Sequence, residues 1–204
     1  MPSPLGKLAW LLAAGAVVML LVFSLGLDQP ISDWILNRGD WALFSVWAQI
    51  AYYAGLGGVQ IGGMVALALA AWLLKRKKAV RAWLWAGAAA LISGVATQII
   101  KHLLGRPRPR MNLPALTFAG PTWETDFHSF PSGHAATSFA LAAMLAARFP
   151  TAAWVFYTLA ALVAAGRVLG GSHHLSDVLG GAVLGLLVGV PLADKVRRAR
   201  TESA

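Results

Sequence analysis

Long uncharged stretches alternate with short polar ones along this chain of 204 residues. The first covers residues 8–27 and follows Lys7, and it is longer than the apolar core of a signal peptide. Five more cover residues 56–74, 82–100, 135–147, 152–165 and 178–193. About twenty apolar residues cross a bilayer as a helix, so the pattern predicts an all-α membrane bundle of about six transmembrane helices. The stretches 135–147 and 152–165 are long enough only if their flanking turns are also helical.

Two further patterns refine this arrangement. Residues 31–50 mix Trp, Asp and Arg with apolar side chains, which predicts a segment lying along the membrane interface. Glycines four residues apart predict close helix packing, at Gly58 with Gly62 and at Gly181 with Gly185 and Gly189. The chain shows no internal repeat, so we expect one domain over residues 1–204.

Composition agrees with a membrane protein. Hydrophobic residues make up 58% of the chain and charged residues only 12%, against about 25% charged in soluble domains. The absence of cysteine excludes disulfide and thiolate chemistry. The net charge of +9 is divided between two membrane faces and forms no single groove, so we do not expect nucleic acid as a partner.

Charge also predicts the orientation. Six spans place both termini on one side of the membrane, and with cytoplasmic termini the inner face holds eleven of the seventeen Lys and Arg residues. The outer face then receives six of the eight acidic residues. The positive-inside rule therefore predicts cytoplasmic termini, with the polar connections around residues 101–134 and 167–177 at the outer face.

Polar residues that a membrane bundle does not need gather in three blocks. The first is 101–110, where Lys101, Arg106, Arg108 and Arg110 surround two prolines that break the helix. Lipid-headgroup arginines are one interpretation of this block. An outer face is normally poor in Arg, however, so the block also predicts a rigid clamp for an anion such as phosphate.

The second block is Pro131-Ser132-Gly133-His134, ahead of an Ala-rich run. It predicts a helix start with Ser132 as N-cap, and the free N–H groups of a helix start bind anions. Gly133 lets a phosphate approach closely, whereas a helix start needs no histidine.

The third block runs from Arg167 through His173 and His174 to Asp177. His173 and Asp177 are four residues apart and share one helix face if the last helix begins near His173. A carboxylate there can fix the imidazole tautomer. An ionisable residue inside a span is costly without a partner, which argues against a merely solvated Asp177.

Together the three blocks resemble the signature of the type 2 phosphatidic acid phosphatase superfamily. That signature is Lys, six residues and Arg-Pro, then Pro-Ser-Gly-His, then Arg, five residues, His, three residues and Asp. The matching residues lie within 101–177 and are Lys101, Arg108-Pro109, Pro131 to His134, Arg167, His173 and Asp177. Where the family often has Ser before the Arg, this chain has Gly166.

The resemblance implies a phosphatase that works through a phosphohistidine intermediate. It implies that His173 is the nucleophile, that Asp177 orients it, and that His134 protonates the leaving oxygen and then activates water. Phosphate would be held by Lys101, Arg108, Arg167, Ser132 and the backbone near Gly133. No metal or other cofactor is implied, and no zinc spacing such as HExxH is present, so we expect activity to survive chelation.

The expected substrate is a phosphorylated lipid. Aromatic residues near the outer face are typical of a membrane–water interface and comprise Trp34, Trp41, Tyr52, Tyr53 and Trp123. A lipid mono- or diphosphate could then enter the site from the bilayer, and residues 111–128 would line the entrance. Undecaprenyl diphosphate is favoured, with phosphatidylglycerophosphate, phosphatidic acid and lipid A 1-phosphate as alternatives, in a bacterial-type inner membrane with the site on its periplasmic or extracellular face.

Two other function classes stay open. Vanadate-dependent haloperoxidases share the motifs, but they are soluble and the predicted spans argue against them. A non-catalytic protein could use the cations to hold or transport an anionic lipid. The oligomeric state and the roles of five residues also stay open, namely Arg106, Arg110, His102, His128 and His174.

Overall fold

The computed structural model describes residues 12, 14–19, 21–23, 25–39 and 42–201. A helical stretch over Ala14–Phe23 comes first. The named elements that follow are α2 (Asp28–Asn37), α3 (Ala42–Gly55), α4 (Gly57–Leu73), α5 (Lys77–Leu104), η1 (Pro109–Met111), η2 (Thr125–Phe127), α6 (Gly133–Arg148), η3 (Pro150–Ala152), α7 (Ala153–Leu169) and α8 (Leu175–Thr201). These described residues form helices and no strand, which confirms the predicted all-α class.

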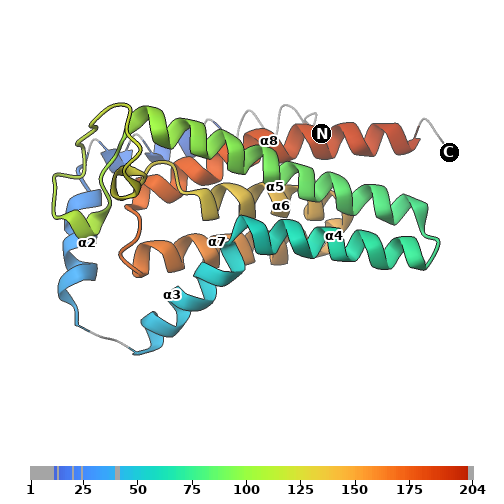
Figure 1. The fold of residues 1–204 in the computed structure, drawn as a ribbon, viewed down its shortest axis with the longest axis horizontal. Coiled ribbons are helices and arrows are strands. Elements are labelled where there is room, and N and C mark those ends of the chain that lie inside the picture. Colours follow the sequence, from blue (N-terminus) through green and yellow to red (C-terminus); the bar gives the residue numbers. More distant parts are fainter. Residues whose placement is uncertain (1–11, 13, 20, 24, 40–41, 202–204) are drawn as a thin grey trace.

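The long helices α4 to α8 run along the long axis of the molecule (Figure 1). The turn between α4 and α5 lies at one end, whereas α2 and the connection between α5 and α6 lie at the other. Helix α6 is central and packs against α5, α7 and α8. Its buried side is built almost entirely from Ala, Ser and Thr, which lets the surrounding helices approach closely.

Three helical segments are long and apolar enough to cross a membrane, at 77–104, 150–169 and 175–197. Two bent pairs raise this number to five if each is one span, namely 14–23 with 28–37 at 71° and 42–55 with 57–73 at 54°. Helix α6 has 16 residues, about 24 Å, which is shorter than the roughly 30 Å of a hydrocarbon core. The fold is therefore that of a multi-pass membrane protein with a short central helix.

Residues 31–50, predicted to lie along the membrane interface, are divided between two helices, α2 and α3. Helix α2 ends before Gly39, whose φ of 76° is left-handed and stops the helix. Helix α3 then leads into α4 across the bend at Leu56. Part of the first predicted stretch and Trp41 lie outside the described residues.

The predicted glycine contacts are confirmed on α8 and wrong on α4. A Cβ added at Gly181 or Gly185 would lie 2.4 Å from the carbonyl oxygen of Ser132 or 2.3 Å from that of Ala136, so α8 packs directly on the α6 backbone. Gly189 meets Ala140 in the same way. Gly58 and Gly62 have nothing within 4 Å of such a Cβ, because this face of α4 points away from the bundle.

We predict that Gly185→Ala destabilises the protein. The new methyl group would force α8 away from α6, at a cost of about 1–3 kcal/mol. The melting temperature of the detergent-solubilised protein should fall, whereas the control Gly58→Ala, in open space, should leave it unchanged or slightly higher. Equal melting temperatures for the two variants would contradict this packing.

Candidate active site

The three polar blocks meet at the end of the bundle that holds the α5–α6 connection. Lys101, near the end of α5, donates from Nζ to the carbonyl oxygen of His128 at 2.6 Å. Arg108 donates from Nη1 to the carbonyl oxygen of Ser172 at 3.1 Å. The N–H of Ser132 donates to the carbonyl oxygen of Asp177 at 2.8 Å. Each block is thus bonded to the other two or to the residues beside them.

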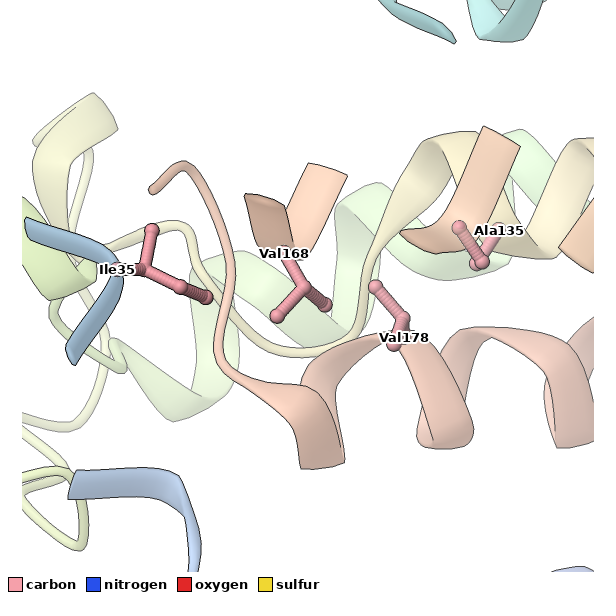
Figure 2. Close-up of a cluster of buried hydrophobic side chains, with 5 residues drawn as sticks. Ile35, Ala135, Val168 and Val178 are labelled. Carbon is pink, nitrogen blue, oxygen red and sulfur yellow. The ribbon is translucent and has the colours of Figure 1, made fainter. Parts of the chain in front are cut away.

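A small apolar cluster packs α2, α6, α7 and α8 against one another near the site (Figure 2). It joins Ile35 of α2 to Ala135 of α6, Ala164 and Val168 of α7 and Val178 of α8. Three of these residues directly follow a predicted site residue in the chain, namely His134, Arg167 and Asp177. Packing of the cluster therefore fixes the backbone positions of His134, Arg167 and Asp177.

His173 and Asp177 form a buried pair at the start of α8. The helix begins at Leu175, so His173 lies just before it and Asp177 lies in its first turn. Nδ1 of His173 is 3.4 Å from Oδ2 of Asp177 and makes no hydrogen bond. Burial lowers the pKa of His173 to about 3, although the Asp177 carboxylate opposes that shift. The imidazole is therefore neutral near pH 7, the form that a nucleophile requires.

His134, in the first turn of α6, contacts α3. Its Nε2 is 3.1 Å from the carbonyl oxygen of Tyr52, and its ring stacks on the Tyr52 ring with centroids 5.5 Å apart. The Arg167 guanidinium lies 5.2 Å from the same Tyr52 ring. Tyr52, which the sequence presented only as an interfacial aromatic, thus joins two predicted site residues. The charges of Lys101 and Arg108 act on His134 as well as on His173.

Several buried polar atoms in this cluster have no hydrogen-bond partner. They include Oγ of Ser132, Nε of Arg167 and Nδ1 of His173. Ser132 occupies the predicted N-cap position of α6, but its side chain makes no capping hydrogen bond. Buried polar groups in folded proteins are nearly always paired, so the unpaired donors of Ser132 and Arg167, beside cations, are suited to bind an anion.

Gly133 has room for a side chain on the protein side. A Cβ there would meet Thr97 Cγ2 at 3.6 Å, which is an ordinary contact. Helix packing therefore does not require glycine at position 133. The close approach of a phosphate remains the predicted reason for glycine there.

The four-cation clamp predicted for the first block is reduced to two cations. Arg106 is fully buried and bonds through Nη1 to Asp177 at 2.5 Å and through Nη2 to Asp28 at 2.8 Å. Arg110 pairs with Asp126 at the exposed surface. Lys101 and Arg108 remain for the site, because the other two guanidinium groups are held by carboxylates.

The other three histidines serve the surrounding structure. The rings of His102 and His128 contact each other with centroids 4.2 Å apart. Nε2 of His128 is 3.0 Å from the carbonyl oxygen of Thr122, within the same connection. Nδ1 of His174 is 2.9 Å from Oγ of Ser32 in α2.

Comparisons with known proteins show the family to which this chain belongs. The family model of the PAP2 superfamily matches residues 82–200. The chain is 34% identical to lipid A 1-phosphatase of Rhizobium johnstonii over 107 residues, which are 50% of this chain and only 44% of that protein. It is 37% identical to decaprenylphosphoryl-5-phosphoribose phosphatase of Mycobacterium tuberculosis over 129 residues, which are 63% of this chain and 68% of that one.

A solved structure has the same fold over almost the whole chain. It is the transmembrane PAP2-type phosphatidylglycerolphosphate phosphatase of Bacillus subtilis, with a TM-score of 0.60 and 22% identity over 99% of this chain and 98% of that one. The family model covers more than half of the chain and includes all three blocks, so this chain belongs to the PAP2 superfamily.

Proposed function

We propose that this protein is a membrane lipid phosphatase that hydrolyses a phosphate mono- or diphosphate ester of a lipid through a phosphohistidine on His173. The observation that carries the proposal is the set of unpaired buried donors on Ser132 and Arg167 beside Lys101, Arg108 and the neutral His173. A phosphoryl group placed there would satisfy these donors and neutralise the cations.

In the proposed first step, Nε2 of His173 attacks phosphorus while Nδ1 faces Asp177. The bond from phosphorus to the leaving oxygen breaks, and His134 gives that oxygen a proton. The leaving oxygen is the lipid oxygen in a monophosphate ester and the bridging oxygen in a diphosphate. In the second step His134 takes a proton from water, whose oxygen attacks phosphorus and releases inorganic phosphate and neutral His173. Phosphoryl transfer needs mainly positioning and charge stabilisation, which Lys101 and the arginines supply.

An apolar cavity beside the site supports a lipid as substrate. It has a volume of about 440 Å³ and lies among α3, α4, α6 and α7, with Trp47, Ala51, Phe156 and Val163 in its wall. A Cβ on Gly55, at the end of α3, would touch both His134 and Val163, so the cavity wall adjoins the site. A hydrocarbon chain in this cavity would extend from a phosphate at His173.

The relatives support the same substrate class without selecting one member. Their names describe phosphatases of lipid A, of a decaprenylphosphoryl sugar and of phosphatidylglycerolphosphate. Undecaprenyl diphosphate stays our preferred substrate, and the name of one relative describes a substrate that also carries a polyprenyl chain, decaprenyl. Phosphatidylglycerophosphate, phosphatidic acid and lipid A 1-phosphate stay as alternatives.

The distribution of charge supports a site at the outer face of a bacterial-type inner membrane. The basic turn between α4 and α5 and the basic end of α8 lie at the end opposite the α5–α6 connection (Figure 1). By the positive-inside rule, that basic end faces the cytoplasm and the site faces away from it.

Loss of either proposed catalytic histidine should abolish turnover. We expect His173→Ala to lower kcat by on the order of 10⁴–10⁶-fold and to form no acid-labile phosphoenzyme. His134→Ala should also lose turnover, but it should still be phosphorylated by a substrate with a good leaving group. The control His102→Ala should stay active. Phosphate release by His173→Ala at the wild-type rate would overturn the mechanism, whereas lipid binding without any phosphate release by the wild-type protein would favour a non-catalytic lipid-binding protein.

Chelation should leave the activity intact. Purified protein in excess EDTA should release phosphate from a panel of undecaprenyl diphosphate, phosphatidylglycerophosphate, phosphatidic acid and lipid A 1-phosphate, with one clearly preferred. Loss of activity in EDTA and recovery with Mg²⁺ or Zn²⁺ would contradict the cation-only mechanism. Equal, weak rates on every lipid would contradict a dedicated substrate.

Blocking the apolar cavity should affect lipid substrates alone. Leu159 lines the cavity and is 55% exposed. We expect Leu159→Trp to lower kcat/KM for a long-chain lipid phosphate about tenfold, which corresponds to about 1.4 kcal/mol. Activity on p-nitrophenyl phosphate should not change, because that substrate has no chain. Leu69→Trp on α4, where Leu69 is equally exposed at 55%, is the matched control.

A further inference from the structure

Both oxygens of the Asp177 carboxylate accept hydrogen bonds in the protein interior. The carboxylate is fully buried. Its Oδ1 accepts a hydrogen bond from Arg106 Nη1 at 2.5 Å, and its Oδ2 accepts from Ser129 Oγ at 2.5 Å and from the backbone N–H of His174 at 2.8 Å. The same Oδ2 is the oxygen nearest to His173. Arg106 is the cation bonded to this carboxylate.

Arg106 is shared with a second buried carboxylate, that of Asp28. Its Nη2 donates to Oδ2 of Asp28 at 2.8 Å. Asp28 also accepts hydrogen bonds from the backbone N–H of Ser176 at 2.9 Å and from its hydroxyl at 2.5 Å. Asp28 is the first residue of α2 and is only 2% exposed. It lies outside residues 82–200, which the family model matches.

The shared contact decides how Arg106 can bind Asp177. A guanidinium binds a carboxylate most strongly in a bidentate pair, in which two parallel N–H groups donate one to each oxygen. Here Nε of Arg106 donates to the carbonyl oxygen of Ala115 at 2.8 Å, and Nη1 donates to Oδ1 of Asp177 and to Oγ of Ser176 at 2.7 Å. The remaining group, Nη2, is engaged by Asp28 and is therefore kept from Asp177. A two-pronged contact would also engage Oδ2 and compete with its contact to His173.

The net charge of Asp28, Arg106 and Asp177 also favours a role for Asp28 in the proposed reaction. Two carboxylates and one guanidinium leave the group with one net negative charge, and this charge is buried beside His173. Attack on phosphorus makes the imidazole ring positive, and a nearby negative charge stabilises that form strongly where water is excluded. Without Asp28, Arg106 would cancel the charge of Asp177.

We propose that Asp28 is a positioning residue that acts through Arg106, limiting Arg106 to one contact with Asp177 so that Oδ2 stays directed at His173. The inference rests on the proposed function, because it requires His173 to be the nucleophile. Helix α2 thereby completes the site from outside the three motif blocks, and the contact between Ser32 and His174 fixes the same helix a second time.

The test compares Asp28→Asn with wild type. Asparagine keeps the size and one acceptor oxygen but removes the charge. We expect kcat to fall about 10–100-fold. The KM and the inhibition constant of inorganic phosphate should not change, because the hydrogen bonds of Asp28 within the described part of the chain go to Arg106 and Ser176 and not to the proposed phosphate-binding residues. Asp33→Asn is the matched control on α2, since Asp33 is exposed and bonds only within its own helix.

A double-mutant cycle separates positioning from a general loss of structure. If Asp28 acts through Asp177, adding Asp28→Asn to Asp177→Asn should lower kcat by less than about twofold more, whereas independent effects would multiply. Should Asp28→Asn lower the melting temperature, the fraction of protein that binds inorganic phosphate is measured as well. A structural role lowers that fraction and kcat together, and this outcome would overturn the inference.

The two proposals fail in different ways. If wild type forms a phosphoenzyme on His173 and Asp28→Asn forms it at the same rate, only the role of Asp28 is wrong. If His173→Ala keeps its activity, the proposed function itself is wrong.

Discussion

The burial of one ionised carboxylate, that of Asp177, constrains the whole active-site end of this protein. A buried charge is costly unless protein groups replace the water that it loses. The replacements are three groups from two segments, namely Arg106 and Ser129 in the α5–α6 connection and the backbone N–H of His174 before α8. The hydrogen bonds to this carboxylate therefore hold the α5–α6 connection against the start of α8. The ion pair between Asp28 and Arg106 holds α2 at the same place.

Close packing of small residues makes such a buried network possible. Glycines of α8 rest on the α6 backbone, and the alanines of α6 leave little space between helices. Water is thereby kept away from the charges, and their interactions are stronger than they would be at a surface. The same exclusion leaves donors on Ser132 and Arg167 unpaired, so a phosphate would gain much of its binding from groups that nothing else satisfies.

The family match and the fold match describe different parts of this arrangement. Residues 82–200 carry the motif blocks that the superfamily shares. The structural likeness extends over nearly the whole chain at 22% identity, so the bundle is preserved through helix packing more than through particular side chains. Tyr52 and Asp28 lie outside the family-matched region and still contact predicted site residues or their partners.

The sequence by itself determined the helical class, the approximate helices and the motif residues of the superfamily. It could do so because a bilayer forces backbone hydrogen bonds into helices and because motif spacing is local. It could not show that Arg106 binds carboxylates while Arg108, two residues later, is left for the site, or that Gly58 and Gly62 face away from the bundle. Those outcomes depend on which distant segment lies opposite each side chain, and only the packed tertiary structure decides that.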